Sequence, residues 1–190
     1  MNALLRPALT LFATLTVLTG LVYPFAVTGI SQLLFPHEAN GSIVTVKGKE
    51  VGSALIGQQF TSPGNFWGRP SATGPYPNNA AVSSGSNLGP LNPALTDAVE
   101  ARIAALKAAD PGNDQPVPVD LVTASGSGLD PDISLAAAYY QMARVAKSRQ
   151  LPVEQVKTLI EQHAERPWLG IFGEPRVNVL ALNLKLDGIR

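Results

Sequence analysis

The stretch PALTLFATLTVLTGLVYPFAVTGISQLLF, residues 7–35, decides how the rest of this 190-residue chain is organised. It contains no charged side chain and is rich in Leu, Ala, Val, Thr and Phe. About 20 apolar residues in a helix are enough to cross a hydrocarbon core of roughly 30 Å. The run is longer than that, so the sequence predicts that residues 1–36 form a transmembrane anchor and that residues 37–190 form one soluble domain.

A cleaved signal peptide is the alternative to a retained anchor. Signal peptides have apolar cores of about 7–15 residues, followed closely by a cleavage site between small residues. Here the apolar run continues through Gly29 and Ile30 to Phe35. This length favours a span that stays in the membrane.

The charges that flank the span predict its orientation. Arg6 precedes it, whereas His37 and Glu38 are the first polar residues after it. Positive charge close to a span tends to remain in the cytoplasm. Lys47 and Lys49 weaken this bias without reversing it. We therefore expect a cytoplasmic N-terminus and a soluble domain on the outer, periplasmic side.

Composition argues against two kinds of partner. Lys plus Arg and Asp plus Glu both number 14 and are scattered, so the chain has no basic stripe of the kind that nucleic acid requires. There is no cysteine, and the two histidines, His37 and His163, lack the spacing of a metal site. The sequence predicts neither a nucleic-acid-binding protein nor a metalloprotein.

Three helices are predicted in the soluble domain. They begin at Asn92-Pro93, Asp130-Pro131 and Pro152, because a capping side chain or a proline in the first turn favours a helix start. In the second helix, Gln141, Arg144 and Ser148 lie opposite an apolar stripe, which predicts a solvated face. The stripe consists of Leu135, Ala138, Tyr139, Met142, Val145 and Ala146.

A few short strands complete the predicted fold. Residues 42–46 and 51–56 read as a hairpin around a turn that contains glycine. Alternating apolar residues predict strands over 117–121 and over 177–186, where Leu180, Leu182, Leu184 and Leu186 repeat with a period of two. The fold class is therefore α/β or α+β.

The pattern S-G-S-x-L-x-P occurs twice, over residues 84–90 and 125–131. A glycine turn before a helix attracts phosphate, but Asp130 and Asp132 would repel an anion placed here. The structural alternative is favoured: glycines supply the turns, serine hydroxyls satisfy backbone groups, and an Asx-Pro pair starts the helix. On this reading five residues are structural helix-entry positions: Ser125, Gly126, Ser127, Gly128 and Asp130.

Several short motifs occur in the order known from one protein family. They are Arg6–Leu9, Asn40–Ser42, Gly52–Gln58, Gly68–Ala72, Ser86–Leu88, Leu121–Ser125, Arg144–Ala146 and Val177–Asn183. From its first residues to its last, the chain resembles the C subunits (KdpC) of bacterial Kdp potassium-transporting ATPases. Any one of these motifs would be a weak signal, but together and in register they are a strong one.

The resemblance implies an accessory subunit without catalytic activity in a high-affinity, ATP-driven potassium importer of the bacterial inner membrane. Its partners would be a channel-like subunit that carries potassium, a P-type subunit that hydrolyses ATP, and membrane lipid. The D-K-T-G phosphorylation motif of P-type pumps is absent from the sequence. The chain would have no cofactor of its own, although ATP could be shared with the hydrolysing subunit.

The family is described as a catalytic chaperone that raises the ATP affinity of the hydrolysing subunit. The glutamine of its Q-x-x-R-V-A segment is proposed to touch the nucleotide, and that glutamine matches Gln141. Arg144 and Arg69 are then candidates for facing a partner. Because ATP is cytoplasmic while the charge bias places Gln141 outside, direct contact and the predicted orientation exclude each other.

Two other functions stay open. A membrane-anchored exported enzyme or binding protein would use the Gly/Ser loops as a ligand site, and its isolated domain would show activity or binding. A pure assembly factor would be dispensable once the pump is complete.

Overall fold

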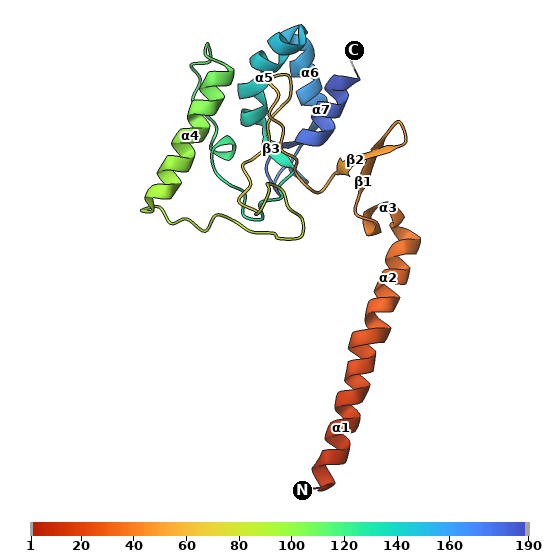
Figure 1. Ribbon diagram of the computed structural model, residues 1–190. Helices are drawn as coiled ribbons and strands as arrows, with labels where there is room; N and C mark the ends of the chain where they lie inside the picture. Colours follow the sequence, from red (N-terminus) through yellow and green to blue (C-terminus); the bar gives the residue numbers. More distant parts are fainter. Residues whose placement is uncertain (1, 189–190) are drawn as a thin grey trace. The chain divides into compact units, whose positions relative to one another are not determined.

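A computed structural model describes residues 2–188 of the chain (Figure 1). The chain divides into two compact units, and the boundary in the sequence falls between Ile43 and Val44. A long apolar helix is followed by a small domain of mixed helices and strands, so the predicted fold class is confirmed. The predicted end of the anchor at residue 36 stays a prediction.

The first unit is a helix that is continuous from Ala3 to Leu34. It consists of α1 (Asn2–Val17), a π-helical stretch η1 (Leu18–Val22) and α2 (Tyr23–Leu34). At about 1.5 Å per residue its 32 residues measure about 48 Å, more than a hydrocarbon core requires. The wider π turn lies just before Pro24, whose missing N–H prevents regular helical pairing. A short helix, α3 (Pro36–Ala39), follows. By length and composition the long helix is a candidate membrane span.

The predicted hairpin is formed by β1 (Ile43–Val46) and β2 (Lys49–Ser53), and all of it except Ile43 belongs to the second unit. Lys47 and Gly48 connect the strands with φ angles of 51° and 79°. Two successive residues with positive φ form the type I′ turn that matches the twist of paired strands. The turn is therefore tighter than the four-residue connection expected from the sequence.

A three-stranded antiparallel sheet has the order β3-β5-β4, where β3 is Asp132–Ser134, β5 is Arg176–Asn178 and β4 is Ala164–Glu165. Ile133 pairs with Val177, and both side chains are buried. Because successive residues of a strand face opposite sides, the neighbouring Asp132, Ser134, Arg176 and Asn178 share the other face. The sheet thus separates an apolar face from a polar one.

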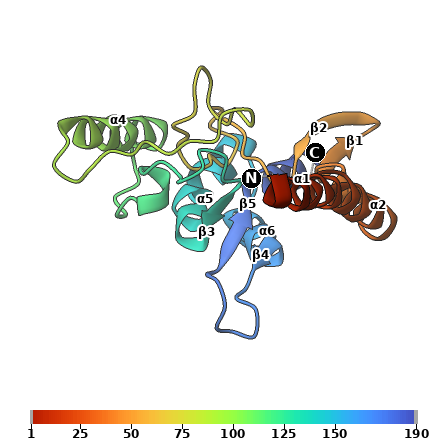
Figure 2. The same cartoon turned by 90° about the horizontal axis from the view of Figure 1, so that it is seen from below.

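The larger helices are α4 (Pro93–Ala109), α5 (Leu135–Arg149), α6 (Val153–His163) and α7 (Val179–Asp187). α5 packs against α6, and α6 against α7, whereas α4 lies at the edge of this unit in both views (Figures 1 and 2). The core includes Phe66, Leu106, Leu121, Ile133, Ala137, Val145, Val156, Ile160, Val177, Leu182 and Leu186.

The starts of α4 and α6 confirm two of the predicted helix starts. Asn92 caps α4, because its Oδ1 atom accepts a hydrogen bond from Ala94 N, and Pro152 directly precedes α6. The second predicted start is wrong. Instead of opening a helix, Asp130-Pro131 leads into β3, and Ser134 caps α5 by accepting from Ala137 N.

Two predicted strands are also wrong, except that residues 177 and 178 belong to β5. Residues 179–187 form α7, in which Val179, Leu182 and Leu186 are buried at helical spacing, and Asn178 Oδ1 caps the helix by accepting from Ala181 N. Residues 119–121 form a 3₁₀ turn, η2 (Val119–Leu121). Pro116 and Pro118 lack the backbone N–H that an inner strand needs, so the apolar alternation there could not form a ladder.

Candidate functional site

The two Gly/Ser loops lie against each other. Ser84 N donates to Ser127 O at 2.9 Å. A Cβ atom on Gly85 would come within 2.9 Å of Gly126 O, and one on Gly128, which has a φ of +69°, within 2.6 Å of Ser84 O. Glycine is therefore needed at both positions because two backbones approach closely. This contact gives the repeated motif a structural explanation that requires no ligand.

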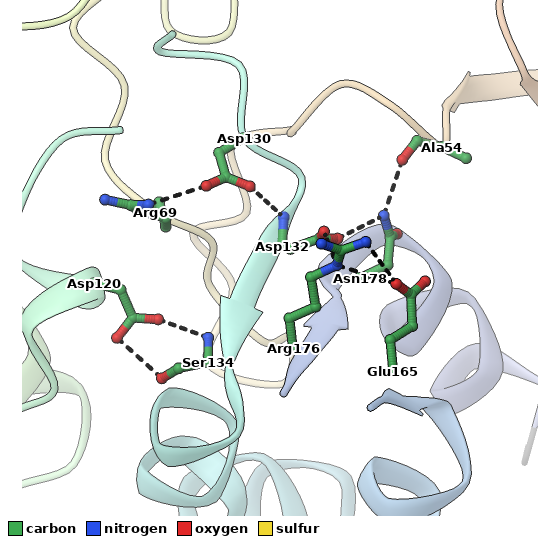
Figure 3. A network of polar contacts seen from close by, with 9 residues as sticks. All are labelled: Ala54, Arg69, Asp120, Asp130, Asp132, Ser134, Glu165, Arg176 and Asn178. Carbon is green, nitrogen blue, oxygen red and sulfur yellow. Dashed lines mark hydrogen bonds and ion pairs between the residues drawn. The ribbon is translucent and has the colours of Figure 1, made fainter. Parts of the chain in front are cut away.

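The second Gly/Ser loop also binds the segment before it. Ser125, which is 3% exposed, donates its N–H to Pro70 O at 3.1 Å, and Ser71 Oγ donates to Gly128 O at 2.7 Å. Asp130 then accepts two hydrogen bonds, from Arg69 Nη1 and from the N–H of Asp132, both at 3.0 Å (Figure 3). The acid that follows the loop is thus already paired with a cation.

Arg176 is the centre of the polar face of the sheet (Figure 3). Its guanidinium pairs with Asp132 at 3.0 Å and with Glu165 at 2.9 Å. Asp132 also accepts from Asn178 Nδ2 at 3.2 Å. Burial raises the pKa of the Asp132 carboxyl, while Arg176 and Asn178 act in the opposite direction.

Asp120 binds the start of α5 from η2. Its carboxylate accepts from Ser134 N at 2.7 Å and from Ser134 Oγ at 3.2 Å (Figure 3). Among residues 2–188, no group of three or more His, Cys, Asp or Glu side chains is arranged to hold a metal ion. The polar contacts around β3 thus connect strands and helix ends to one another.

Gln141 holds an extended segment, residues 62–67, against α5. Its Oε1 accepts from Trp67 N at 2.8 Å, and its Nε2 donates to Trp67 O at 3.1 Å and to Ala137 O at 3.2 Å. Arg144 Nη2 donates to the same Oε1 at 2.7 Å. Both lone-pair positions and both amide hydrogens are thereby used. Gln141 is 1% exposed.

Asn183 of α7 makes the same contact with the preceding residue. Phe66 N donates to Asn183 Oδ1 at 2.8 Å, and Asn183 Nδ2 donates to Phe66 O at 3.0 Å. Two amide side chains from two helices therefore bind the N–H and C=O groups of consecutive residues. We call Gln141 and Asn183 the amide clamp. Phe66 itself is fully buried.

Arg144 also contacts this extended segment. It donates to Pro63 O, and its guanidinium carbon lies 4.5 Å from the centre of the Trp67 ring, a cation–π distance. Burial lowers the pKa of Arg144 to about 10, so it remains charged at neutral pH. Arg149 extends the contacts, donating to Gly64 O and pairing with Asp187 at 2.7 Å.

The predicted solvated face of α5 is wrong for Gln141 and Arg144, which are 1% and 4% exposed, and is confirmed only for Ser148, which is exposed. A helical wheel places them opposite the apolar stripe, but it cannot show that an extended segment from 74 to 81 positions earlier covers that side. Arg69 is half-buried and paired with Asp130. Asn183 was missed because its neighbours read as a strand.

An exposed apolar tip joins β4 to β5. Its large side chains are Trp168, Leu169, Ile171 and Phe172, each at least 62% exposed. Trp168 and Phe172 exchange backbone hydrogen bonds at 2.9 and 3.0 Å, and their rings lie 5.8 Å apart. The loop projects away from the helices (Figure 2). We call residues 168–172 the apolar tip.

Comparison with known proteins identifies the family of the chain. The family described as KdpC, the c chain of K⁺-transporting ATPases, matches residues 5–188. The potassium-transporting ATPase KdpC subunit of Janthinobacterium sp. is 65% identical over 98% of this chain and 99% of its own length. The subunit of the same name from Polaromonas naphthalenivorans is 66% identical over 100% and 97%, and that of Herpetosiphon aurantiacus 62% identical over 100% and 98%. The chain therefore belongs to the KdpC family of K⁺-transporting ATPase subunits.

Proposed function

We propose that the chain is an accessory subunit of an ATP-driven potassium uptake complex, without chemistry of its own. It binds the channel-like and ATP-hydrolysing subunits and raises the ATP affinity of the latter. The domain after the span lies on the periplasmic side, so this effect passes through subunit contacts and not through the nucleotide.

The apolar tip is the observation that carries this proposal. Four large apolar side chains exposed together on a short hairpin are costly in water, and such patches mark contact surfaces. Leu169 has a φ of +53°, a left-handed conformation that is unfavourable for a bulky side chain. Backbone strain of this kind is typical of functional sites. A surface of this composition suits the apolar surface of another subunit.

The tip is tested by co-purification from cells that express the whole complex. Trp168→Ser combined with Phe172→Ser should reduce recovery of the other subunits with the chain. Leu91→Ser is the matched control, because Leu91 is 96% exposed but precedes α4 and is not part of the tip. Unchanged recovery of the complex with the tip variant would refute the proposed contact.

The amide clamp supports an indirect effect on ATP. All four hydrogen-bonding positions of Gln141 are occupied by the chain itself, so contact with a nucleotide would require breaking buried hydrogen bonds, each worth about 0.5–1.5 kcal/mol net. The accessory role is tested by comparing the KM for ATP of the complex with and without the chain. A lower KM with the chain present supports it, and equal values contradict it.

The Gly/Ser loops favour this function over an exported binding protein that would use them as its site. The backbones of the two loops pack directly against each other at Gly85 and Gly128, where a ligand would otherwise approach. Asp130 is already paired with Arg69. We retain Ser125, Gly126, Ser127, Gly128 and Asp130 as structural residues, although they precede a strand and not a helix.

A further inference from the structure

A cavity of about 390 Å³ lies between α4 and the loops of residues 58–78. Phe60, Trp67, Leu106 and Leu121 contribute apolar surface to its walls. Binding sites for small molecules have volumes of about 300–1,000 Å³ and walls that are mostly apolar with a few polar groups. The cavity has the size and lining of such a site. It shares Trp67 with the amide clamp, but neither Gln141 nor Asn183 lines it, and no residue of the apolar tip does.

Two arginines line this cavity, Arg69 from the loop and Arg102 from α4. Arg69 pairs through Nη1 with Asp130, but its Nε is buried and has no hydrogen-bond partner among the described residues. Arg102 Nη1 is likewise buried and unpartnered within residues 2–188. A buried donor without an acceptor costs about 1–3 kcal/mol, and more when it is charged. Two such donors around one cavity point to an acceptor that binds there.

The charge of the cavity indicates what kind of acceptor fits. No Asp or Glu is among its lining residues. Asp130 offsets the charge of Arg69, whereas none of the ion pairs among residues 2–188 involves Arg102. One positive charge therefore remains uncompensated. A single negative charge would balance it, and a doubly charged phosphate would not.

We propose that this cavity binds a small organic carboxylate whose body is apolar. The carboxylate lies between Arg102 and Arg69, because a guanidinium and a carboxylate are both planar and form paired hydrogen bonds. The apolar body packs against Phe60, Leu106 and Leu121. The bound acid connects α4 to the loop at residues 58–71. This ligand site is independent of the proposed role in potassium uptake.

The proposal is tested with the full chain in detergent, using 3-phenylpropionate as the probe. Thermal unfolding is followed by circular dichroism as the probe concentration rises. The carboxylate should raise the melting temperature of the wild type, whereas its neutral counterpart 3-phenylpropanamide should not. In Arg102→Gln the apparent Kd should weaken about tenfold or more, as expected for the loss of a charge-assisted hydrogen bond.

Two controls keep the test decisive. Arg166→Gln removes an exposed arginine outside the cavity and should leave binding unchanged. Without ligand, Arg102→Gln should melt no lower than the wild type, since it removes a half-buried charge whose Nη1 has no hydrogen-bond partner among residues 2–188. If Arg102→Gln fails to fold, Arg102→Lys, which keeps the charge but not the planar group, replaces it. Any one of four results would overturn the proposal. They are no stabilisation of the wild type by the carboxylate, equal stabilisation by the amide, equal affinity of Arg102→Gln for the carboxylate, and stronger stabilisation by inorganic phosphate.

Discussion

Gln141 and Asn183 hold the backbone of residues 66 and 67 from two helices that are distant in sequence. The resemblance to the family singled out Gln141, but residue types alone gave no signal that Asn183 has the same role. The clamp depends on an extended segment that lies between α5 and α7, and only the tertiary fold brings these parts together. A side chain's chemistry can be read from sequence, whereas its burial here could not.

The first prediction compares the two members of the amide clamp. Gln141→Ala and Asn183→Ala should each lower the free energy of unfolding by about 2–4 kcal/mol, because each leaves a buried N–H and C=O unpaired. In the assembled complex both variants should change the KM for ATP to a similar extent. Denaturant unfolding and steady-state ATPase assays measure the two quantities.

The matched pair separates a structural role from nucleotide contact. Asn183 was never a candidate for touching ATP, so it reports the effect of the clamp alone. A rise in KM that occurs with Gln141→Ala but not with an equally destabilising Asn183→Ala would contradict our account and favour direct contact.

The second prediction concerns Asp132, whose carboxyl pKa is raised above its usual range mainly by burial. Between the unfolded and the folded pKa, the folded state binds the proton more strongly, so the wild type loses stability as pH rises through this window. Asp132→Asn does not titrate. Its melting temperature should exceed that of the wild type at pH 7, and the difference should shrink as pH falls to about 4.

Glu165→Gln is the control for this pH dependence. It removes the exposed partner of Arg176, and exposed ion pairs contribute only about 0–1 kcal/mol. Its melting temperature should stay near that of the wild type at both pH values. A difference between Asp132→Asn and the wild type that grows on acidification would show that the sign is wrong.

At the scale of elements, α4, α6 and the β1–β2 hairpin could be predicted because local signals specify them: an Asn-Pro start, a proline before an amphipathic stretch, and glycine in a turn. α7 could not. Its leucines at positions 180, 182, 184 and 186 fit a period of two, yet Val179, Leu182 and Leu186 fit a helix equally well. Asn178 favours the helix over the strand because its side chain caps the first turn of α7. The residues around Asn178 in the sequence give no sign of this capping role.

The third prediction concerns the turn of the apolar tip. Leu169→Asn should raise the melting temperature of the purified chain or leave it unchanged, because Asn tolerates the left-handed conformation that strains Leu. The same change should weaken association with the other subunits, because it removes an exposed apolar side chain. Thermal unfolding and co-purification test the two effects separately. A destabilised chain would show that Leu169 packs within the tip.

At the scale of the whole molecule, the composition predicted the fold class correctly. An uncharged run longer than a bilayer requires forms one continuous helix, and the remaining residues form a small mixed domain. What composition could not give is the side of the membrane on which that domain works. The charges near the span, Arg6 before it and Glu38 after it, predict the periplasmic side.

The location of the soluble domain is therefore the measurement that tests our central claim most directly. Two reporters are fused separately after Arg190 and compared in cells. Alkaline phosphatase is active only outside the cytoplasm. Green fluorescent protein stays dark when it is exported by the general secretion route. We predict an active phosphatase and a dark fluorescent fusion, which excludes contact between Gln141 and cytoplasmic ATP. A bright fluorescent fusion with an inactive phosphatase would place the domain in the cytoplasm and contradict an effect that passes through subunit contacts from the periplasm.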